Sequence, residues 1–304
     1  MTSPSRRLAS LLSLGALALG ATACSEEVPD RDPTPVSNES EATDPAESPT
    51  DTPTESESPE AEGTVAVPVY FVGDTPQGPR LFREFRAVPA DNPLMEATAL
   101  MLAGDTLDPD YRTLWPQVEI SDVSATDGVL LVQIPSDGFT ERPDGMSRKA
   151  ANLALQQLVF TLQGVQQERA PIVIKRGGSD FRLFGLPTDV ELTAASALRT
   201  LNLVNITSPA EGDTVTGDTL TVTGVSNSFE ASGPCRLIAG DEEITLEAYQ
   251  AEGWMEDRLF PFEVELSLAD VGTGDVLVQC ETDDPSGGAE GNGPAIDTKL
   301  ITVH

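Results

Sequence analysis

The sequence predicts an α+β region followed by an all-β region of the β-sandwich class, with an acidic segment ahead of both that does not fold. Residues 63–187 alternate short β-branched and aromatic runs with two helical segments. Residues 202–304 contain about seven short β-rich runs between Gly, Pro, Asn and Asp, and show no helical period. Residues 25–62 hold 13 acidic side chains against a single arginine and no aromatic residue. We therefore expect a mixed or antiparallel sheet with helices, then a sandwich, joined by a linker at 188–201.

The N-terminus has the three parts of a secretion signal. Two arginines come first, residues 8–23 are apolar, and small residues lead directly into Cys24. The apolar run is too short to cross a bilayer comfortably, so residues 1–23 are predicted to be a signal peptide. The "ATAC" sequence resembles the lipobox of bacterial lipoproteins, which implies that Cys24 carries lipid at the start of the mature chain. An ordinary secreted protein cut near Ala23 is the alternative, and the choice between Sec and twin-arginine export stays open.

The segment 24–62 is interpreted as the lipidated cysteine followed by a disordered acidic linker. Its like charges repel one another, and it has too little apolar surface to offset the entropy of ordering. An extended chain covers about 3 Å per residue. The linker would therefore hold a folded domain tens of ångströms from the membrane.

The elements of the region 63–187 are bounded by turn and capping residues. Residues 64–72 and 80–89 are predicted strands, joined by a turn rich in Gly, Asp and Pro. Residues 91–104 begin with Asp-Asn-Pro and end in Gly, which predicts a helix. This pattern is the start of a strand, strand, helix order.

A hairpin, a second helix and a further strand complete this region. The runs 118–125 and 128–135 flank Asp127 and a glycine, a pair that favours a tight hairpin turn. Residues 146–164 place four apolar side chains on one helical face, and Gly164 is predicted to end the helix. Residues 171–178 read as a strand. The simplest arrangement of these elements is one mixed or antiparallel sheet covered by the helices.

These elements resemble the GerM domain, a family named from spore germination proteins and found in bacterial envelope lipoproteins. The resemblance rests on "VYFV", "NPLMEATALMLAG", "DGVLLVQIPSDG" and "ALQQLVFTLQGV", which occur in the family's order over about residues 64–186. It implies an interaction or structural module, and it brings no catalytic set to this chain.

The last third of the chain is predicted to be a sandwich of short antiparallel strands. The stretches "ITSPAEGDTVTGDTLTVTGVSNSFEA" and "DPSGGAEGNGPAIDTKLITV" resemble the immunoglobulin-like domain that follows GerM domains. The immunoglobulin Cys-Trp-Cys spacing is absent, because Trp254 comes 19 residues after Cys235. Strands are expected near residues 203–208, 220–224, 235–239, 244–248, 260–266, 275–281 and 298–303.

Cys235 and Cys280 are candidates for a disulfide, because the region is expected to be exported to an oxidising compartment. A bridge would close a loop of about 45 residues and stabilise the fold by about 3 to 4 kcal/mol. Two free buried cysteines are the alternative. A zinc site is not expected, because the chain has one histidine, His304, and no close cysteine pair.

The charge distribution disfavours nucleic acid as a partner. The net charge is -32, and residues 200–304 alone contribute -17. A phosphate backbone needs a basic footprint that these segments lack. The acidity fits an extracytoplasmic protein, or one with cations or basic partners.

The sequence contains two candidate ligand sites. The first is a set of basic side chains in this acidic chain. Arg80, Arg83 and Arg86 lie on one predicted strand, and Lys175 and Arg176 lie on another. If these five side chains converge, a polyanionic wall polymer or peptidoglycan carboxylates are suitable ligands. A spacing of three scatters side chains over both faces of a strand, so dispersed surface charges are the alternative.

The second candidate is a loop for calcium near the C-terminus. Asp283, Asp284 and Asp297 flank a glycine-rich stretch and could present carboxylate oxygens. The spacing does not fit an EF-hand, so a plain hairpin loop is the preferred interpretation and no metal is expected.

The predicted function is a lipid-anchored, extracytoplasmic module that binds or scaffolds in envelope or spore-related assembly, without enzymatic activity and without a cofactor. Its expected partners are the membrane, through the lipid, and an envelope protein or a wall polymer. A wall hydrolase using carboxylates such as Asp122, Asp127 or Asp137 is the competing class, and a solute-binding lipoprotein is the third.

Overall fold

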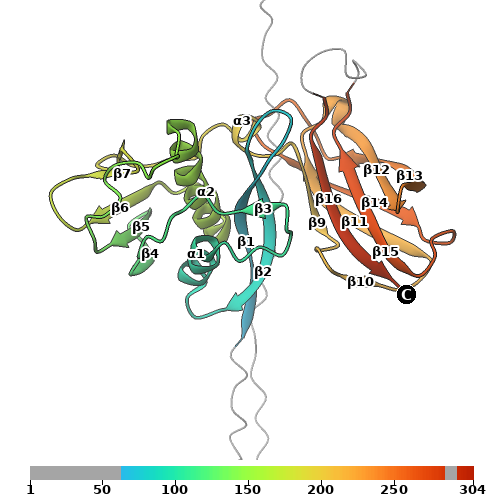
Figure 1. Cartoon of the computed structure of the whole chain (residues 1–304), viewed down its shortest axis with the longest axis horizontal. Coiled ribbons are helices and arrows are strands. Elements are labelled where there is room, and N and C mark those ends of the chain that lie inside the picture. The colour runs from blue at the N-terminus through green and yellow to red at the C-terminus, as the bar shows by residue number, and fades with distance from the viewer. Residues whose placement is uncertain (1–62, 285–292) are drawn as a thin grey trace, which may run out of the picture. The chain divides into compact units, whose positions relative to one another are not determined.

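The computed structural model describes residues 63–284 and 293–304, all of which belong to one compact unit, Glu57–His304 (Figure 1). The predicted signal peptide, Cys24 and the acidic linker lie outside these residues. Within the described ranges, no helix combines the length and the apolar composition needed to cross a bilayer.

A three-stranded antiparallel sheet opens the described chain. β1 (Thr64–Gly73) pairs along its whole length with β2 (Arg80–Pro89), and the short β3 (Tyr111–Arg112) pairs with the end of β1. Successive side chains of a strand point to opposite faces. On β1 this alternation directs Val69 and Phe71 into the core.

Two capped helices begin and end near the predicted capping residues, with one difference. In α1 (Pro93–Ala103) the side chain of Asn92 accepts a hydrogen bond from the backbone of Met95, and Gly104 ends the helix in the left-handed conformation. Ser147 caps α2 (Arg148–Gln166). The prediction that Gly164 ends this helix is wrong.

Gly164 lies within the last turn of α2 because the helix packs closely on β1. A Cβ atom at this position would lie 2.7 Å from Cγ of Pro68. The residue that ends the helix is Gln167, which adopts the left-handed conformation itself. Gly164 therefore allows α2 to pack closely on β1 and does not cap the helix.

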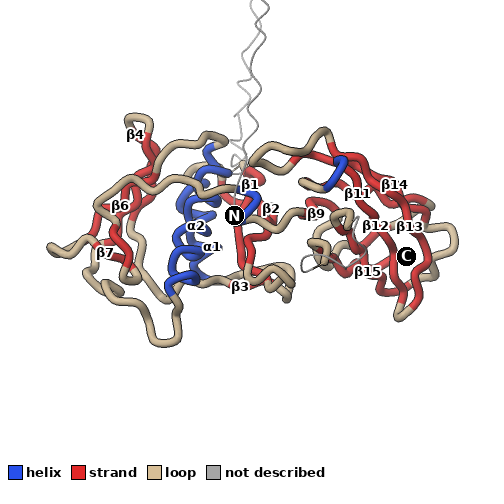
Figure 2. Tube along the Cα trace, turned by 90° about the horizontal axis from the view of Figure 1, so that it is seen from above, coloured by secondary structure: helices blue, strands red, loops and turns tan. Residues whose placement is uncertain are grey.

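The remaining strands of the region form a second sheet, where one sheet was expected. β4 (Asp122–Thr126) and β5 (Val129–Ile134) form the predicted hairpin, and β6 (Ile172–Arg176) pairs with β5 in parallel. Figures 1 and 2 place both helices between the two sheets. A single core therefore buries the inner face of each sheet. Two two-residue strands that the pattern could not predict follow, β7 (Arg182–Leu183) and β8 (Leu186–Pro187).

The second region is a curled antiparallel sheet that closes over one core. Its strand order is β10-β16-β15-β12-β13-β14-β11-β9, and only β10 and β16 pair in parallel. The α+β class and the sandwich class are confirmed. All seven predicted strands are present, and β10 is additional. The strands are β9 (Val204–Ser208), β10 (Thr214–Val215), β11 (Thr219–Ser226), β12 (Ser232–Ala239), β13 (Glu242–Ala251), β14 (Phe260–Ser267), β15 (Gly274–Glu281) and β16 (Ile296–Val303).

A disulfide joins Cys235 on β12 to Cys280 on β15. The two residues lie directly opposite each other on paired strands, with their Cα atoms 4.1 Å apart, and both are buried. The bridge therefore connects neighbouring strands. In antibody domains the corresponding bridge connects the two sheets.

Residues 188–201, the expected linker, contain a short helix, α3 (Ala197–Thr200). Ala197 and Leu201 pack on Leu81 in a small apolar cluster, and the backbone of Asn202 donates to the carbonyl of Leu81. The segment therefore continues the packing of the first region into the second.

Candidate functional site

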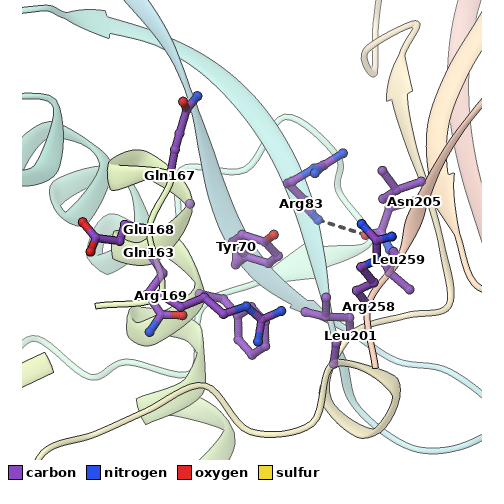
Figure 3. A pocket seen from close by; sticks show the side chains of 14 residues that line it. Tyr70, Arg83, Gln163, Gln167, Glu168, Arg169, Leu201, Asn205, Arg258 and Leu259 are labelled. Carbon is purple, nitrogen blue, oxygen red and sulfur yellow. Dashed lines mark hydrogen bonds between the residues drawn. The ribbon is translucent and has the colours of Figure 1, made fainter. Parts of the chain in front are cut away.

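A pocket of about 250 Å³ lies on the outer face of β1 and β2, beside the C-terminal end of α2 (Figure 3). The antiparallel register places Tyr70 of β1 directly opposite Arg83 of β2, and both residues line the pocket. Asn205 of β9 closes one side, and its side-chain oxygen accepts a hydrogen bond from the backbone N–H of Arg83. The pocket is therefore built from strands, the end of α2 and the loops that carry Arg169 and Arg258.

Three arginine residues line this pocket. Arg83 comes from β2, Arg169 follows the end of α2, and Arg258 precedes β14. The chain as a whole has 18 basic and 50 acidic side chains. The one acidic residue of the lining is Glu168, whose carboxylate is directed away from Arg169 in Figure 3. The lining of the pocket is therefore positively charged, whereas the protein as a whole is negatively charged.

Part of the hydrogen-bonding capacity of these arginines is unused. Arg83 donates from one terminal nitrogen to the hydroxyl of Thr207 at 2.9 Å, whereas its buried Nε has no hydrogen-bond partner among the described residues. Arg169 is exposed and forms no hydrogen bond or ion pair within the part of the chain that the structure describes. Arg258 bonds Glu256 through Nε.

The Tyr70 hydroxyl is kept in its neutral form. Burial raises the pKa of Tyr70, and the positive charges of Arg83 and Arg169 oppose this shift without cancelling it. A neutral phenol can donate a hydrogen bond. The lining contains no serine, cysteine, histidine or aspartate. Its chemistry is therefore mainly that of positive charge and hydrogen-bond donors, which suits anion binding.

A second polar cluster is buried between β3 and β16. The Lys299 ammonium lies 2.6 Å from Asp108 and 3.3 Å from Asp297, and it donates to the Tyr111 hydroxyl at 2.7 Å. Tyr111 in turn donates to Asp297 at 2.6 Å. The other carboxylate oxygen of Asp297 accepts from the backbone of Ile206. We call Lys299, Asp108, Asp297 and Tyr111 the lysine cluster.

Burial controls the protonation of the lysine cluster. It raises the pKa of Asp297, which Lys299 opposes, and it raises the pKa of Tyr111 well above its ordinary value, together with the charge of Asp297. For Lys299 burial acts to lower the pKa, but the two carboxylates outweigh it and the pKa is raised. Because each charge faces an opposite charge and none reaches solvent, the cluster is a structural element.

The five basic side chains singled out from the sequence do not form one site. Arg83 lines the pocket, whereas Arg86 lies on the opposite face of β2, where it bonds Asp105. Lys175 and Arg176 belong to β6 in the other sheet, and Arg176 donates to the carbonyls of Gly138 and Arg182. Arg80 begins β2 and shares the face of Arg86. The alternative of dispersed charges is the arrangement observed.

The candidate calcium residues are also separated. Asp297 is buried in the lysine cluster with both oxygens engaged. Asp283 and Asp284 stand next to residues 285–292, which lie outside the described residues. Within the described residues no group of three or more His, Cys, Asp or Glu side chains has the arrangement of a metal site.

The carboxylates of the hydrolase alternative do not pair either. Asp122 begins β4 and bonds Ser124 and Gln133, whereas Asp127 occupies the turn at the other end of the same strand. Asp137 follows β5. No acid and base pair is formed from these three residues.

Tyr70, Arg169 and Arg258 were missed in the sequence. Arg169 and Arg258 are each preceded by acidic residues in loops, a context typical of solvated charge. The available signal was the hairpin of β1 and β2, whose register determines that Tyr70 faces Arg83. Nothing local indicates that Arg258, far along the chain, reaches the same pocket.

Comparison with known proteins identifies two families. Residues 68–180 match the family described as "Sporulation and spore germination", and residues 203–289 match the "Immunoglobulin-like domain of bacterial spore germination". No curated protein matches the sequence.

Solved structures give distant matches. The tandem GerMN domains of the sporulation protein GerM from Bacillus subtilis match with 12% identity and a TM-score of 0.35, over 49% of this chain and 51% of that chain. This chain thus spans about half the length of that protein. A putative lipoprotein from Clostridium perfringens matches with 15% identity and a TM-score of 0.28, over 43% of this chain and 88% of that chain.

Proposed function

This chain carries a sporulation and spore germination domain of the GerM type followed by an immunoglobulin-like domain of bacterial spore germination, and from this pairing we propose a binding or scaffold lipoprotein of the cell envelope. The role is non-catalytic and belongs to envelope or spore-related assembly. Its partner is an envelope protein or a wall polymer.

The single observation that carries this proposal is the pairing of the two domains, and the chemistry of the arginine-lined pocket agrees with a binding role. The pocket's three arginines and its neutral phenol supply positive charge and hydrogen-bond donors that can hold a ligand. The disulfide between Cys235 and Cys280 supports a location outside the cytoplasm, because such bridges persist in oxidising compartments.

Anchoring through Cys24 is the membrane part of the proposal. The "ATAC" sequence and the apolar run before it support lipid modification at this cysteine. Cells that express Cys24→Ser and are fed a labelled fatty acid should yield unlabelled protein that leaves the membrane fraction. Ser25→Ala, which keeps the thiol, should remain labelled and membrane-bound. Equal labelling of the two variants would exclude Cys24 as the anchor.

The binding role is tested with the lipidated protein cross-linked in living cells. Complexes recovered from native membranes are identified by mass spectrometry, and a reproducible envelope protein or wall fragment is the expected result. The same preparation is run on peptidoglycan zymograms. A zone of wall degradation would replace the binding role by that of a hydrolase.

A further inference from the structure

The arginine-lined pocket gathers positive charge that the rest of the chain neutralises only in part, because Arg258 pairs with Glu256 whereas Arg169 forms no ion pair with a described residue. Arg83, Arg169 and Arg258 are brought together from positions more than 80 residues apart along the chain, in a protein of net charge -32. Acidic side chains are abundant enough to pair every arginine. Arg169 forms no hydrogen bond or ion pair with a described residue, and the buried Nε of Arg83 has no hydrogen-bond partner among the described residues, so both arginines keep donors available for a partner from outside the chain.

The donors in the pocket are of the type that recognises oxygen anions. A guanidinium group presents its N–H groups in a plane that matches carboxylate and phosphate oxygens. The Tyr70 hydroxyl adds a neutral donor beside Arg83. The volume of about 250 Å³ accommodates an anionic group together with several attached atoms.

An apolar groove continues from this pocket and indicates the chemistry of the neighbouring part of the ligand. The groove, of about 300 Å³, shares Tyr70, Arg83, Gly164 and Gln167 with the pocket. Its remaining lining is apolar and includes Pro68 and the partly exposed Phe85. A ligand with an anionic end and an apolar neighbouring part would contact both.

We propose that the pocket formed by Tyr70, Arg83, Arg169 and Arg258 binds a single oxyanion, a carboxylate or a phosphate, at the end of a ligand whose adjoining atoms are apolar. The proposal rests on the binding role proposed above and names the class of ligand. The proposed site differs from the set of five basic residues suggested by the sequence, because Arg83 is the only residue that belongs to both sets.

The decisive variant is Arg169→Gln. Arg169 is exposed and forms no hydrogen bond or ion pair with a described residue, so its replacement should leave the fold intact. Arg148→Gln is the matched control, because it removes the same charge at the other end of α2, roughly 30 Å away along the helix. Melting temperatures of the two variants verify that both are folded.

Binding is measured by NMR titration of the arginine Nε–H signals with two probes at constant ionic strength. Glycerol phosphate supplies a phosphate, and muramyl dipeptide supplies a carboxylate. At least one probe should shift the signals of Arg83 and Arg169, and Arg169→Gln should bind it at least about tenfold more weakly, whereas Arg148→Gln should bind it as the parent does. The probe that binds identifies the source of the oxyanion.

Two results would overturn the proposal: neither probe binds the folded protein, or Arg148→Gln weakens binding as much as Arg169→Gln. The cross-linking experiment separates this failure from failure of the proposed function. If Arg169→Gln still captures the same envelope partner while the probes do not bind, the scaffold role stands and the oxyanion site does not.

Discussion

At the scale of single residues, Lys299 has the largest expected effect on stability. Its ammonium is the one positive charge of the lysine cluster and faces Asp108 and Asp297, all three being buried. Lys299→Met leaves two carboxylates buried without a counter-ion, which should lower the free energy of unfolding by about 3 to 5 kcal/mol. Urea denaturation at pH 7 measures this loss.

The loss should shrink as the pH is lowered from 7 towards 4. Without Lys299 the pKa of Asp297 rises further above its ordinary value of 3.8, so the folded variant takes up a proton that the unfolded chain lacks. Lys175→Met is the matched control, because the Lys175 side chain is exposed on β6, and it should change stability by less than about 0.5 kcal/mol. Equal stability of the two variants would show that the cluster is not structural.

The tyrosines allow a second residue-scale prediction, about alkaline pH. The chain has three tyrosines, and burial raises the pKa of each, with that of Tyr249 reaching about 12. The folded protein should therefore show little phenolate absorbance at pH 10.5, whereas the urea-unfolded chain should show three groups titrating near pH 10. Phenolate titration of the folded protein near pH 10 would contradict the burial of these rings.

The same shifts determine how stability changes with pH. The folded state holds phenolic protons that the unfolded state has lost, so their contribution is complete below pH 10 and is lost as the pH rises towards the folded pKa. For Tyr249, which bonds Ser226 and the carbonyl of Glu281, the loss is on the order of 2 to 3 kcal/mol between pH 10 and 12. Tyr249→Phe should reduce the slope of stability against pH in this range.

At the scale of elements, the contact between α2 and β1 depends on Gly164. Alanine usually stabilises a helix by about 1 kcal/mol relative to glycine. Here its Cβ would lie 2.7 Å from the rigid ring of Pro68, and overpacking of this kind costs about 1 to 3 kcal/mol. Gly164→Ala should therefore lower the free energy of unfolding by up to about 2 kcal/mol, as thermal denaturation would show.

Gln166→Ala is the control for this prediction. Gln166 is exposed in the same turn of α2, so alanine changes helix propensity there without a steric clash. Its stability should stay within about 0.5 kcal/mol of the parent. An increase in stability for Gly164→Ala would mean that the helix moves away from Pro68 at little cost.

At the scale of the whole molecule, the described regions share contacts that favour unfolding as one unit. Leu81 forms a β-bridge with Leu201, the backbone of Arg83 bonds Asn205, and the lysine cluster joins β3 to β16. Exposing either region alone would uncover buried charge. Calorimetry should therefore show one transition, with equal calorimetric and van't Hoff enthalpies. Two separate transitions would indicate that these contacts are weak.

The local elements were predictable because their signals lie within a few residues of each other. The Asp127–Gly128 turn, the Asn92 cap and the seven β-rich runs of the last third each correspond to an observed element. Two-residue strands such as β3 were not predictable, because they contain too few residues to show a period. Gly164 was misread because a glycine at a helix end is usually a cap.

The sequence by itself determined the two fold classes, the turns that separate their elements and the excess of acidic charge. These properties depend on short-range periodicity and composition. Only the tertiary structure decided that the strands of the first region divide between two sheets, that Lys299 is buried, and that Arg83, Arg169 and Arg258 share a pocket. Such groupings depend on packing between segments far apart in the chain, and the local sequence does not encode which distant side chains meet.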